Sequence, residues 1–430
     1  MGQLDENDDN KNRKYPVIDK RIAMTYAKDS VATLRRQLYD PYVKFFRWAV
    51  DRLQDRDGIV CLVTNNSFVD QIAFDGMRKN LIKDFSCIYH VHLEGNVRHN
   101  PTLSGTAYNV FGIQVGVGIT IAVRASKHRK HRLLFHRIDK TLRRESKLAW
   151  LGKSGNICGI QWQALIPDAR GTWLIPEHGA EFGAFIPIGS KETKLARGDD
   201  QAVVFKQYGR GVATNADAYV YAWSHSTLAA RAKGMVEDFN SQLDRWKRND
   251  QPADLDDFLR VDESVHKWIR NTKRTLLRGS YARFEETSIR SAFYRPFNKR
   301  FHFFDRTFNE DTYQFPRIFP TPATEAENRL LAITDLGSEK PFMLLISDSI
   351  TDMHLVGAGS ACQCFPFYVY DEDGSNRREN ITDWALTQFR QHYGDDTIGK
   401  WDIFHYVYGL LHHPGYRDKF ADNLKRELPR

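Results

Sequence analysis

Ile59-Val-Cys-Leu-Val-Thr-Asn-Asn-Ser67 begins with five consecutive apolar residues and ends in a polar turn. An apolar run of this length is typical of a strand that is buried on both faces of a parallel sheet. Upstream of it, residues 38–53 are apolar at helical spacing, and Asp40-Pro41 supplies a cap and a first-turn proline. Residues 2–36 are polar and predict a loop that leads into this helix.

The residues that follow extend the same sheet. Apolar positions from Ile72 to Leu81 predict a helix, residues 87–93 a second strand, and residues 110–123 a third strand that returns beside the second. Helix, strand, helix, strand and strand in this order is the second half of a doubly wound α/β sheet that ends in an antiparallel hairpin. A half sheet by itself would have a long unpaired edge, which natural proteins avoid. We therefore expect an α/β chain that begins in the middle of a domain.

Composition narrows the class of protein. A chain of 430 residues with 41% hydrophobic and 13% aromatic residues is not disordered, and its length suggests two or three domains. It contains no apolar run of about 18 residues, as a membrane span would need, and no signal peptide. We therefore expect a cytoplasmic protein with no membrane partner. The five cysteines form no Cys-x-x-Cys pair, so neither a disulfide framework nor a zinc site is indicated.

The charge of the chain is unevenly distributed. Its 62 Lys and Arg exceed its 54 Asp and Glu, a net charge of +8. Residues 124–147 and residues 267–300 each carry ten basic against two acidic residues. Two basic segments on an otherwise acidic chain are typical of a polyanion-binding surface, although either segment alone is equally well explained as a solvated face. The DNA-binding candidates are Arg129, Lys130 and Arg132 in the first segment, and Lys267, Arg270, Lys273, Arg274, Arg278, Arg295, Lys299 and Arg300 in the second.

The second basic segment has an internal pattern. Lys267, Arg270, Arg274 and Arg278 are spaced three and four residues apart. On a helix that ends at Gly279 they form one stripe, which can lie along phosphates. Residues 291–305 then interleave aromatic residues with arginine and lysine. This interleaving suits backbone contacts combined with base stacking, and the alternative is a buried strand whose aromatic residues are core.

A series of motifs runs in order along the chain. They include Val43-Lys-Phe-Phe-Arg-Trp48, Val63-Thr-Asn-Asn-Ser-Phe68, Gly209-Arg-Gly-Val-Ala-Thr-Asn-Ala-Asp-Ala218, Tyr294-Arg-Pro-Phe297, Tyr313-Gln-Phe-Pro-Arg317, His354-Leu-Val-Gly-Ala-Gly359, Gln363-Cys-Phe-Pro-Phe-Tyr368 and Asn380-Ile-Thr-Asp-Trp384. The first two resemble the adenine-specific DNA methyltransferase module of type ISP restriction-modification enzymes. The others resemble that family's C-terminal specificity domain, which recognises an asymmetric DNA target. The resemblance implies the second half of a Rossmann-like methyltransferase sheet, followed by an α+β target-recognition domain.

The departures from the family pattern are as informative as the matches. The sequence contains no Asn-Pro-Pro-Tyr, the family's catalytic motif, and no Phe-x-Gly-x-Gly cofactor motif. The resemblance implies S-adenosylmethionine as the cofactor of the complete family enzyme, with none expected to bind this chain alone. Without the cofactor loop, methyl transfer by this chain alone is not expected, because the methyl donor must be positioned in line with the amino nitrogen. The implied partners are double-stranded DNA and the missing N-terminal methyltransferase, helicase and nuclease portion.

Four residues are candidates for a base pocket. Asn65 and Asn66 follow the carboxyl end of the first strand, where α/β sheets bind ligands, although a simple Asn-rich helix cap explains them as well. Tyr108 and Phe111 lie in the region that matches the family's eighth methyltransferase motif, where an aromatic ring can stack on an extruded base. For these two residues the alternative is a core aromatic at the start of a strand.

Other chemistries find little support. His90-Val-His92 places two imidazoles on one face of a strand, and Cys362-Gln-Cys364 lies close to His354 in sequence, but neither has further ligands at a metal-site spacing. A Gly-x-Ser-x-Gly elbow is absent, and Asp371-Glu-Asp373 is better explained as an exposed turn. We therefore assign no catalytic residue and no metal ligand.

The expected domain plan has three parts. Residues 1–123 are the C-terminal part of the methyltransferase domain, residues 124–154 are a basic connector or a strand pair facing DNA, and residues 155–430 are the target-recognition domain, stopping short of the family's C-terminus. The leading hypothesis is the DNA target recognition part of a type ISP enzyme, which acts as an enzyme only with the missing portion. The alternative is a stand-alone nucleic-acid-binding protein without methyltransferase context.

Overall fold

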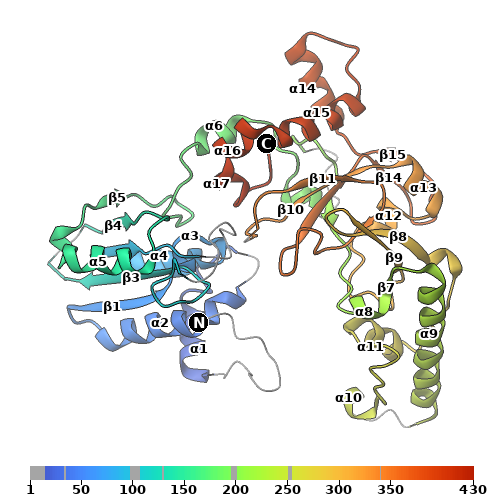
Figure 1. Ribbon diagram of the computed structural model, residues 1–430, viewed down its shortest axis with the longest axis horizontal. Helices are drawn as coiled ribbons and strands as arrows, with labels where there is room; N and C mark the ends of the chain where they lie inside the picture. Colours follow the sequence, from blue (N-terminus) through green and yellow to red (C-terminus); the bar gives the residue numbers. More distant parts are fainter. Residues whose placement is uncertain are drawn as a thin grey trace. The chain divides into compact units, whose positions relative to one another are not determined.

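The chain folds as a mixed α/β protein with several small sheets. The computed structural model describes residues 15–32, 35–96, 107–127, 130–194, 201–249, 254–338 and 340–430. It divides into two compact units, Met1–Gly179 and Ala180–Arg430, drawn in Figure 1 in colours that run from blue at the N-terminus to red at the C-terminus.

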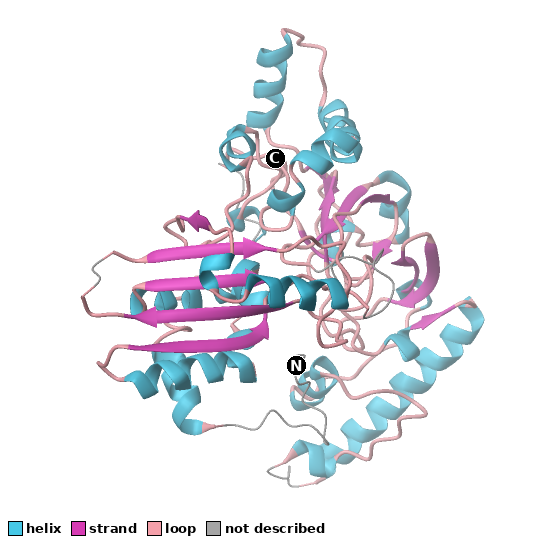
Figure 2. Ribbon diagram, turned by 60° about the vertical axis from the view of Figure 1, so that its left-hand side comes forward, coloured by secondary structure: helices cyan, strands magenta, loops and turns pink. Residues whose placement is uncertain are grey.

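The first unit contains a five-stranded sheet in the order β1-β3-β2-β4-β5. The strands are β1 Gly58–Asn65, β2 Cys87–His92, β3 Val117–Arg124, β4 Arg132–Arg137 and β5 Gln163–Leu165. β3 is antiparallel to both β1 and β2, so β1 and β2 run in the same direction, as Figure 2 shows. The predicted return of the third strand beside the second is confirmed.

The helices of this unit precede its first strand or lie between its strands in sequence. They are α1 Pro16–Met24, α2 Pro41–Leu53, α3 Ser67–Asp70, α4 Asp75–Asp84 and α5 Arg144–Ser154. α2 begins at Pro41 with Asp40 at its N-cap, as predicted. The prediction of a loop over residues 2–36 is wrong at α1, whose only buried residue is Ile22, so its amphipathic pattern is too weak to be recognised in the sequence.

Two helical layers cover opposite faces of the sheet. α2, α3 and α4 pack against Val60, Ile88 and Phe135 on one face. α5 packs through Trp150 on the other face, near Val91. The alternation of side chains along each strand assigns these residues to their faces.

The prediction that the first strand is buried on both faces is wrong. In β1 the side chains of Ile59 and Val63 are 65% and 51% exposed, and Cys61 between them is exposed as well. These residues point to the face on which α5 packs, but they lie outside the buried cluster that α5 forms there. In addition, among the described residues no strand pairs with the outer edge of β1.

The segment expected as a basic connector contributes to this sheet. β4 pairs with β2 in parallel register, and Leu133 and Phe135 lie on one face of the strand, where their side chains enter the core. The expected boundary at residue 123 falls inside β3, and the first compact unit extends to Gly179. β4 also pairs with β5 in antiparallel register, so the segment does contain a member of a strand pair.

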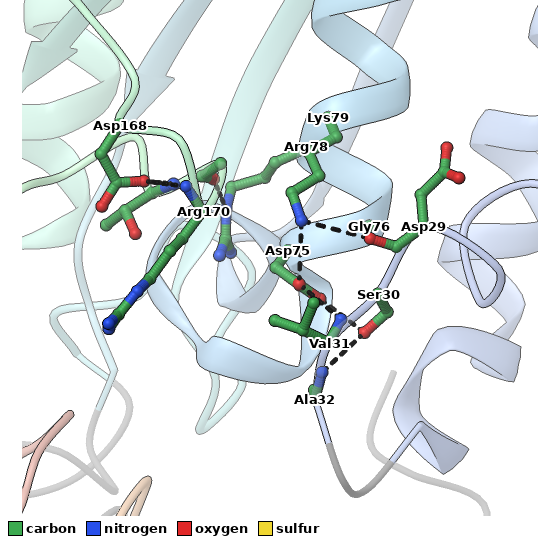
Figure 3. A network of polar contacts seen from close by, with 12 residues as sticks. Asp29, Ser30, Val31, Ala32, Asp75, Gly76, Arg78, Lys79, Asp168 and Arg170 are labelled. Atoms are coloured by element: carbon green, nitrogen blue, oxygen red, sulfur yellow. Dashed lines mark hydrogen bonds and ion pairs between the residues drawn. The ribbon is translucent and has the colours of Figure 1, made fainter.

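A polar network fixes the turn after α1 to the start of α4. The Asp75 carboxylate accepts hydrogen bonds from Ser30 Oγ at 2.5 Å and from the Val31 amide at 2.9 Å, and Figure 3 shows it between this turn and Lys79. Buried Arg78 donates to the carbonyl oxygen of Gly171 at 2.7 Å. Residues far apart in the sequence are thereby joined within the first unit.

The second unit contains two four-stranded sheets and a short two-stranded one. Their orders are β11-β10-β13-β6, β12-β8-β9-β7 and β14-β15. The strands are β6 Gly209–Arg210, β7 Tyr221–Ala222, β8 Ile289–Arg295, β9 Asn298–Phe303, β10 Leu330–Thr334, β11 Leu344–Ser347, β12 Ile350–Thr351, β13 Cys362–Pro366, β14 Tyr368–Val369 and β15 Arg378–Glu379.

The helices around these sheets include the long α9 His225–Arg248. The others are α6 Gly179–Ala184, α7 Lys191–Lys194, α8 Asp217–Val220, α10 Leu255–Phe258, α11 Arg270–Leu277, α12 Phe315–Ile318, α13 Pro322–Glu327, α14 Asp383–Tyr393, α15 Lys400–His412, α16 Pro414–Lys419 and α17 Ala421–Leu424. Within the described ranges, every helix is too short or too polar to cross a lipid bilayer.

Candidate nucleic-acid interface

Helix α11 carries most of the predicted basic stripe. It begins at Arg270 and ends at Leu277, with Arg278 as its C-cap and Gly279 at a φ of +69°, while Lys267 lies before its first turn. Thr272 and Leu276 are buried, so the opposite side of the helix faces solvent. The sequence therefore predicted the helix and its two faces, apart from the position of Lys267.

The cations of α11 differ in whether a carboxylate compensates their charge. Arg270 Nε lies 3.1 Å from Glu310 Oε1, and Lys273 Nζ pairs with Asp256. Lys267, Arg274 and Arg278 are exposed and form no ion pair with a described carboxylate. These three are consequently the cations of this segment whose charge is fully available to a polyanion.

The hairpin of β8 and β9 carries the remaining candidates of the second segment. Lys299 Nζ lies 2.7 Å from Asp348 Oδ1. Arg295 Nη1 lies 2.7 Å from Asp352 Oδ1, and its Nη2 lies 3.5 Å from Asp217 Oδ2. Both cations are therefore engaged within the protein.

Asp352 is the centre of the network that holds Arg295. Its carboxylate also accepts hydrogen bonds from Tyr221 Oη at 2.9 Å and from the His354 amide at 2.8 Å. Burial raises the pKa of Asp352, and the Arg295 guanidinium opposes that increase. Asp352 was not among the sequence candidates, because its side-chain partners Arg295 and Tyr221 are 57 and 131 residues away along the chain.

Arg300 occupies a different environment. Its Cζ lies 4.2 Å from the ring centroid of Tyr294 and 4.5 Å from that of Trp223. Trp223 is 66% exposed, and Arg300 makes no ion pair with a carboxylate of the described chain. Two aromatic rings thus orient a guanidinium at the surface without neutralising it. Trp223 was not among the sequence candidates; it directly follows β7, which pairs with β9.

The first basic segment is less uniform than its composition suggests. Lys130 and Arg132 are exposed at the start of β4, whereas Arg129 lies outside the described residues. Arg137 Nε lies 3.3 Å from Glu94 Oε1. Lys147 is fully buried, and its ammonium donates to backbone carbonyls. Counting charges overestimated the number of cations that this segment presents to solvent.

The base-pocket candidates lie on two segments that meet at the carboxyl end of β1. The amide of Asn66, after β1, donates to the Gly116 carbonyl at 3.0 Å, just before β3. Asn109 Nδ2, between Tyr108 and Phe111, donates to the Val115 carbonyl at 2.6 Å. The turn after β1 and the described part of the loop over residues 107–116 are therefore neighbours.

The four candidates nevertheless differ in their roles. Asn65 Oδ1 accepts from the Ser67 amide at 2.8 Å, which is the capping role given as its alternative. Asn66 is buried and donates to the Val117 carbonyl at 2.6 Å. Phe111 is 57% exposed, and Tyr108 is partly exposed. Of the two rings, Phe111 has more of its surface available for stacking.

His90 on β2 is buried close to the turn after β1. Its Nδ1 lies 2.9 Å from Thr120 Oγ1, while its Nε2 has no hydrogen-bond partner in the described residues. Burial lowers the pKa of His90 to about 3. A Cβ atom on Gly118 would lie 2.0 Å from Asn66 Oδ1 and 2.7 Å from His90 Nε2, so only glycine fits there. His90 therefore acts as an uncharged polar core residue.

The described residues also show how the other sequence candidates are arranged. The rings of His90 and His92 lie 6.2 Å apart, and the sulfur atoms of Cys362 and Cys364 lie 4.0 Å apart in a buried strand. Across the described ranges, no group of three His, Cys, Asp or Glu side chains is arranged to hold a metal ion.

Comparison with known proteins identifies several relatives. The family model for the type ISP C-terminal specificity domain matches residues 203–430. The cryo-EM structure of a DrdV–DNA complex is 37% identical with a TM-score of 0.81, and the match covers 100% of this chain and 41% of that chain. A nuclease-deletion mutant of the type ISP restriction-modification enzyme LlaGI, in complex with a DNA substrate mimic, is 31% identical with a TM-score of 0.79, covering 100% of this chain and 38% of that one.

A third structure, the ATP-dependent type ISP restriction-modification enzyme LlaBIII bound to DNA, has a TM-score of 0.80. Its identity is 24%, and the match covers 100% of this chain and 28% of that one, so it supports the fold alone. No curated protein matches the chain. The chain spans less than half the length of each of these three structures.

Proposed function

This chain belongs to the type ISP restriction-modification family, and from that premise we propose that it recognises the DNA target of such an enzyme. The observation that carries the proposal is the exposed, uncompensated pair Arg274 and Arg278 on α11, inside the region matched by the specificity-domain model. The solved structures of DrdV, LlaGI and LlaBIII contain DNA or a DNA mimic, which supports the same partner.

The electrostatics favour a phosphate backbone as the first contact. A cation that is already paired with a carboxylate contributes little net charge, whereas an unpaired one releases a counterion from DNA when it binds. Lys267, Arg274 and Arg278 are unpaired within the described residues, and Arg300 adds a fourth such charge on β9. Phosphate contacts of this kind position a protein on DNA, while base-edge contacts provide sequence specificity.

Salt dependence tests this proposal directly. Replacing Arg274 and Arg278 together with alanine should weaken duplex binding and reduce the slope of log K against log[salt] by about two, because each phosphate contact contributes about 0.9. The matched control replaces Arg377 and Lys419, which are paired with Glu327 and Glu181 on other elements. Equal slopes for both double variants and the unmodified chain would remove α11 from the interface.

We also propose that the first unit is the second half of a Rossmann-like methyltransferase sheet. The order β1-β3-β2, with β3 antiparallel between two strands of the same direction, supports this assignment. The unpaired edge of β1 and its exposed side chains Ile59 and Val63 offer a place where further strands can add. In this proposal those strands come from the N-terminal methyltransferase portion, which also brings the helicase and nuclease.

This assignment has a consequence for the cofactor. The turn after β1, Thr64 to Ser67, contains no glycine and makes a capping contact through Asn65. A phosphate or adenosine cradle needs glycine at such a turn. This turn therefore does not fit the adenosine end of S-adenosylmethionine, and we assign no step of adenine methylation to this chain alone. Tight binding of S-adenosylmethionine to the isolated chain would contradict this assignment.

The DNA upstream of Met1 distinguishes this context from a stand-alone DNA-binding protein. An open frame that encodes Asn-Pro-Pro-Tyr and a Gly-rich cofactor loop is expected there. Co-expression of that product with this chain should yield a complex, and replacing Ile59 and Val63 with lysine should abolish it. Absence of such a frame, even an interrupted one, would favour the stand-alone function.

A further inference from the structure

The tip of the β8–β9 hairpin exposes an aromatic residue in an unfavourable backbone conformation. Arg295 pairs with Asn298, so Pro296 and Phe297 form a two-residue turn. Phe297 has a φ of +59°, and its side chain is 89% exposed. Proline followed by a positive φ matches the pattern of a type II turn, in which the second central position favours glycine or asparagine.

Folding alone does not account for a phenylalanine at this position. A positive φ is rare for a bulky residue and carries a local strain. A ring exposed to this extent gains almost no burial that would offset the strain. Glycine at position 297 would relieve the backbone and remove an apolar group from water. A strained and exposed residue of this kind indicates that its contacts are made with a partner.

The surroundings of Phe297 identify the chemistry of that partner. Arg300 lies three residues after Phe297, inside β9, so the Cα atoms of the two residues are at most about 10 Å apart at roughly 3.3 Å per residue. Its guanidinium is oriented by Trp223 and Tyr294 and has no carboxylate partner in the described residues. About 10 Å corresponds to roughly three steps of 3.4 Å along one DNA strand. An apolar tip and an unpaired cation at this separation are complementary to a base step and a nearby phosphate.

We propose that Phe297 is a wedge that inserts between two stacked base pairs of duplex DNA, while Arg300 contacts the phosphate backbone within about three nucleotides of that step. This inference rests on the proposed function and extends it to a specific contact. Apolar wedges on rigid elements unstack a base step and kink the duplex. A surface for single strands would instead need several aromatic rings in a row along a groove, whereas this hairpin presents one ring at its tip.

The test uses the full chain and a short duplex selected from a random pool by retention on the unmodified protein. 2-Aminopurine replaces adenine at successive positions, and its fluorescence rises where a base is unstacked. We expect a rise at one step with the unmodified chain and none with Phe297→Ala, which should bind about tenfold more weakly. Phe297→Leu, which keeps an apolar wedge, should retain most of the signal.

Two controls separate a lost contact from a folding defect. Phe297→Gly should lose the 2-aminopurine signal while its thermal unfolding midpoint stays equal to or above that of the unmodified chain, because glycine relieves the positive φ. Tyr393→Ala removes another exposed aromatic ring, on α14, and should leave both DNA binding and fluorescence unchanged.

The outcomes distinguish this inference from the proposed function. Unchanged fluorescence and affinity for Phe297→Ala, combined with a salt slope that still depends on Arg274 and Arg278, would overturn the wedge and leave DNA recognition in place. If Phe297→Ala instead loses binding to the N-terminal methyltransferase portion while DNA unstacking is unaffected, Phe297 is a protein-docking residue. That outcome would likewise overturn the wedge. If the unmodified chain retains no duplex from the random pool, both the wedge and the proposed function are overturned.

Discussion

The ammonium of Lys147 donates a hydrogen bond to the carbonyl oxygen of Tyr108 across 2.6 Å, and a second to the carbonyl of Leu93 across 2.7 Å. The lysine lies on α5 and is fully buried. Burial lowers its pKa, and the nearby charge of Glu94 opposes this effect. The segment that carries the base-pocket candidates Tyr108 and Phe111 is thus anchored to α5, the helix on the face of the sheet opposite α2, α3 and α4.

Replacing Lys147 with methionine should loosen this segment. The variant keeps the apolar stem but leaves two carbonyl oxygens without their charged donor, so we expect the free energy of unfolding of the first unit to fall by about 3 kcal/mol. Hydrogen exchange of the amides in β2 and in residues 107–116 measures the effect locally. Lys153→Met removes an exposed cation from the same helix and should change the exchange rates little.

Arg295 is expected to affect stability more than DNA binding. Arg295→Met leaves the buried carboxylate of Asp352 without its cation, and breaking such a pair costs about 3 kcal/mol. Asp352→Asn in the same chain should recover part of the loss, because the unpaired charge is then absent. A double-mutant cycle by chemical denaturation measures this coupling. Additive effects of the two substitutions would show that the ion pair contributes nothing to stability.

His90 should make the first unit sensitive to acid. Its pKa is about 3 in the folded state, through burial and to a lesser extent through Arg137, against about 6.5 when unfolded. Below pH 6.5 the unfolded chain takes up a proton that the folded chain does not, so stability falls as pH decreases towards 3. At pH 5 the loss is about 2 kcal/mol.

Hydrogen exchange of the β2 and β3 amides at pH 7 and pH 5, corrected for intrinsic rates, measures this loss. His90→Gln should abolish most of the difference, whereas His131→Gln, at an exposed residue of the same unit, should preserve it. An equal pH dependence in the unmodified chain and in His90→Gln would show that His90 is not the responsible group.

Local patterns predicted elements whose apolar periodicity is strong. α2 and α11 followed from spacing alone, because one buried face defines each helix, and the pairing of the third strand with the second was also predicted, although its position between the first and second strands was not. The hairpin within residues 291–305 was not predicted, since Pro296-Phe297 lacks the Gly or Asn that marks a two-residue turn. The exposure of β1 was missed because an apolar run does not reveal which neighbours cover it.

The candidate interface was predictable as a region but not residue by residue. Charge counting located α11 and β9, yet it could not separate Arg274, which is unpaired, from Arg270 and Lys299, whose partners Glu310 and Asp348 are 40 or more residues away in sequence. Lys147 was counted as a surface cation, although Trp150 and Leu151 follow it at helical spacing on the buried side of α5. Ion pairing and burial are tertiary properties that periodicity indicates only in part.

Substitutions at Arg300 separate charge from geometry at the hairpin. Arg300→Ala removes one phosphate contact, so it should weaken duplex binding and reduce the salt slope by about one. Arg300→Lys keeps the charge and should keep the slope. A lysine ammonium stacks less well on Trp223 and Tyr294 than a planar guanidinium, so its affinity should still fall by about threefold. Titrations of labelled duplex at several salt concentrations measure both quantities. If the lysine variant matches the unmodified chain in affinity and slope, the aromatic rings do not orient this cation for DNA.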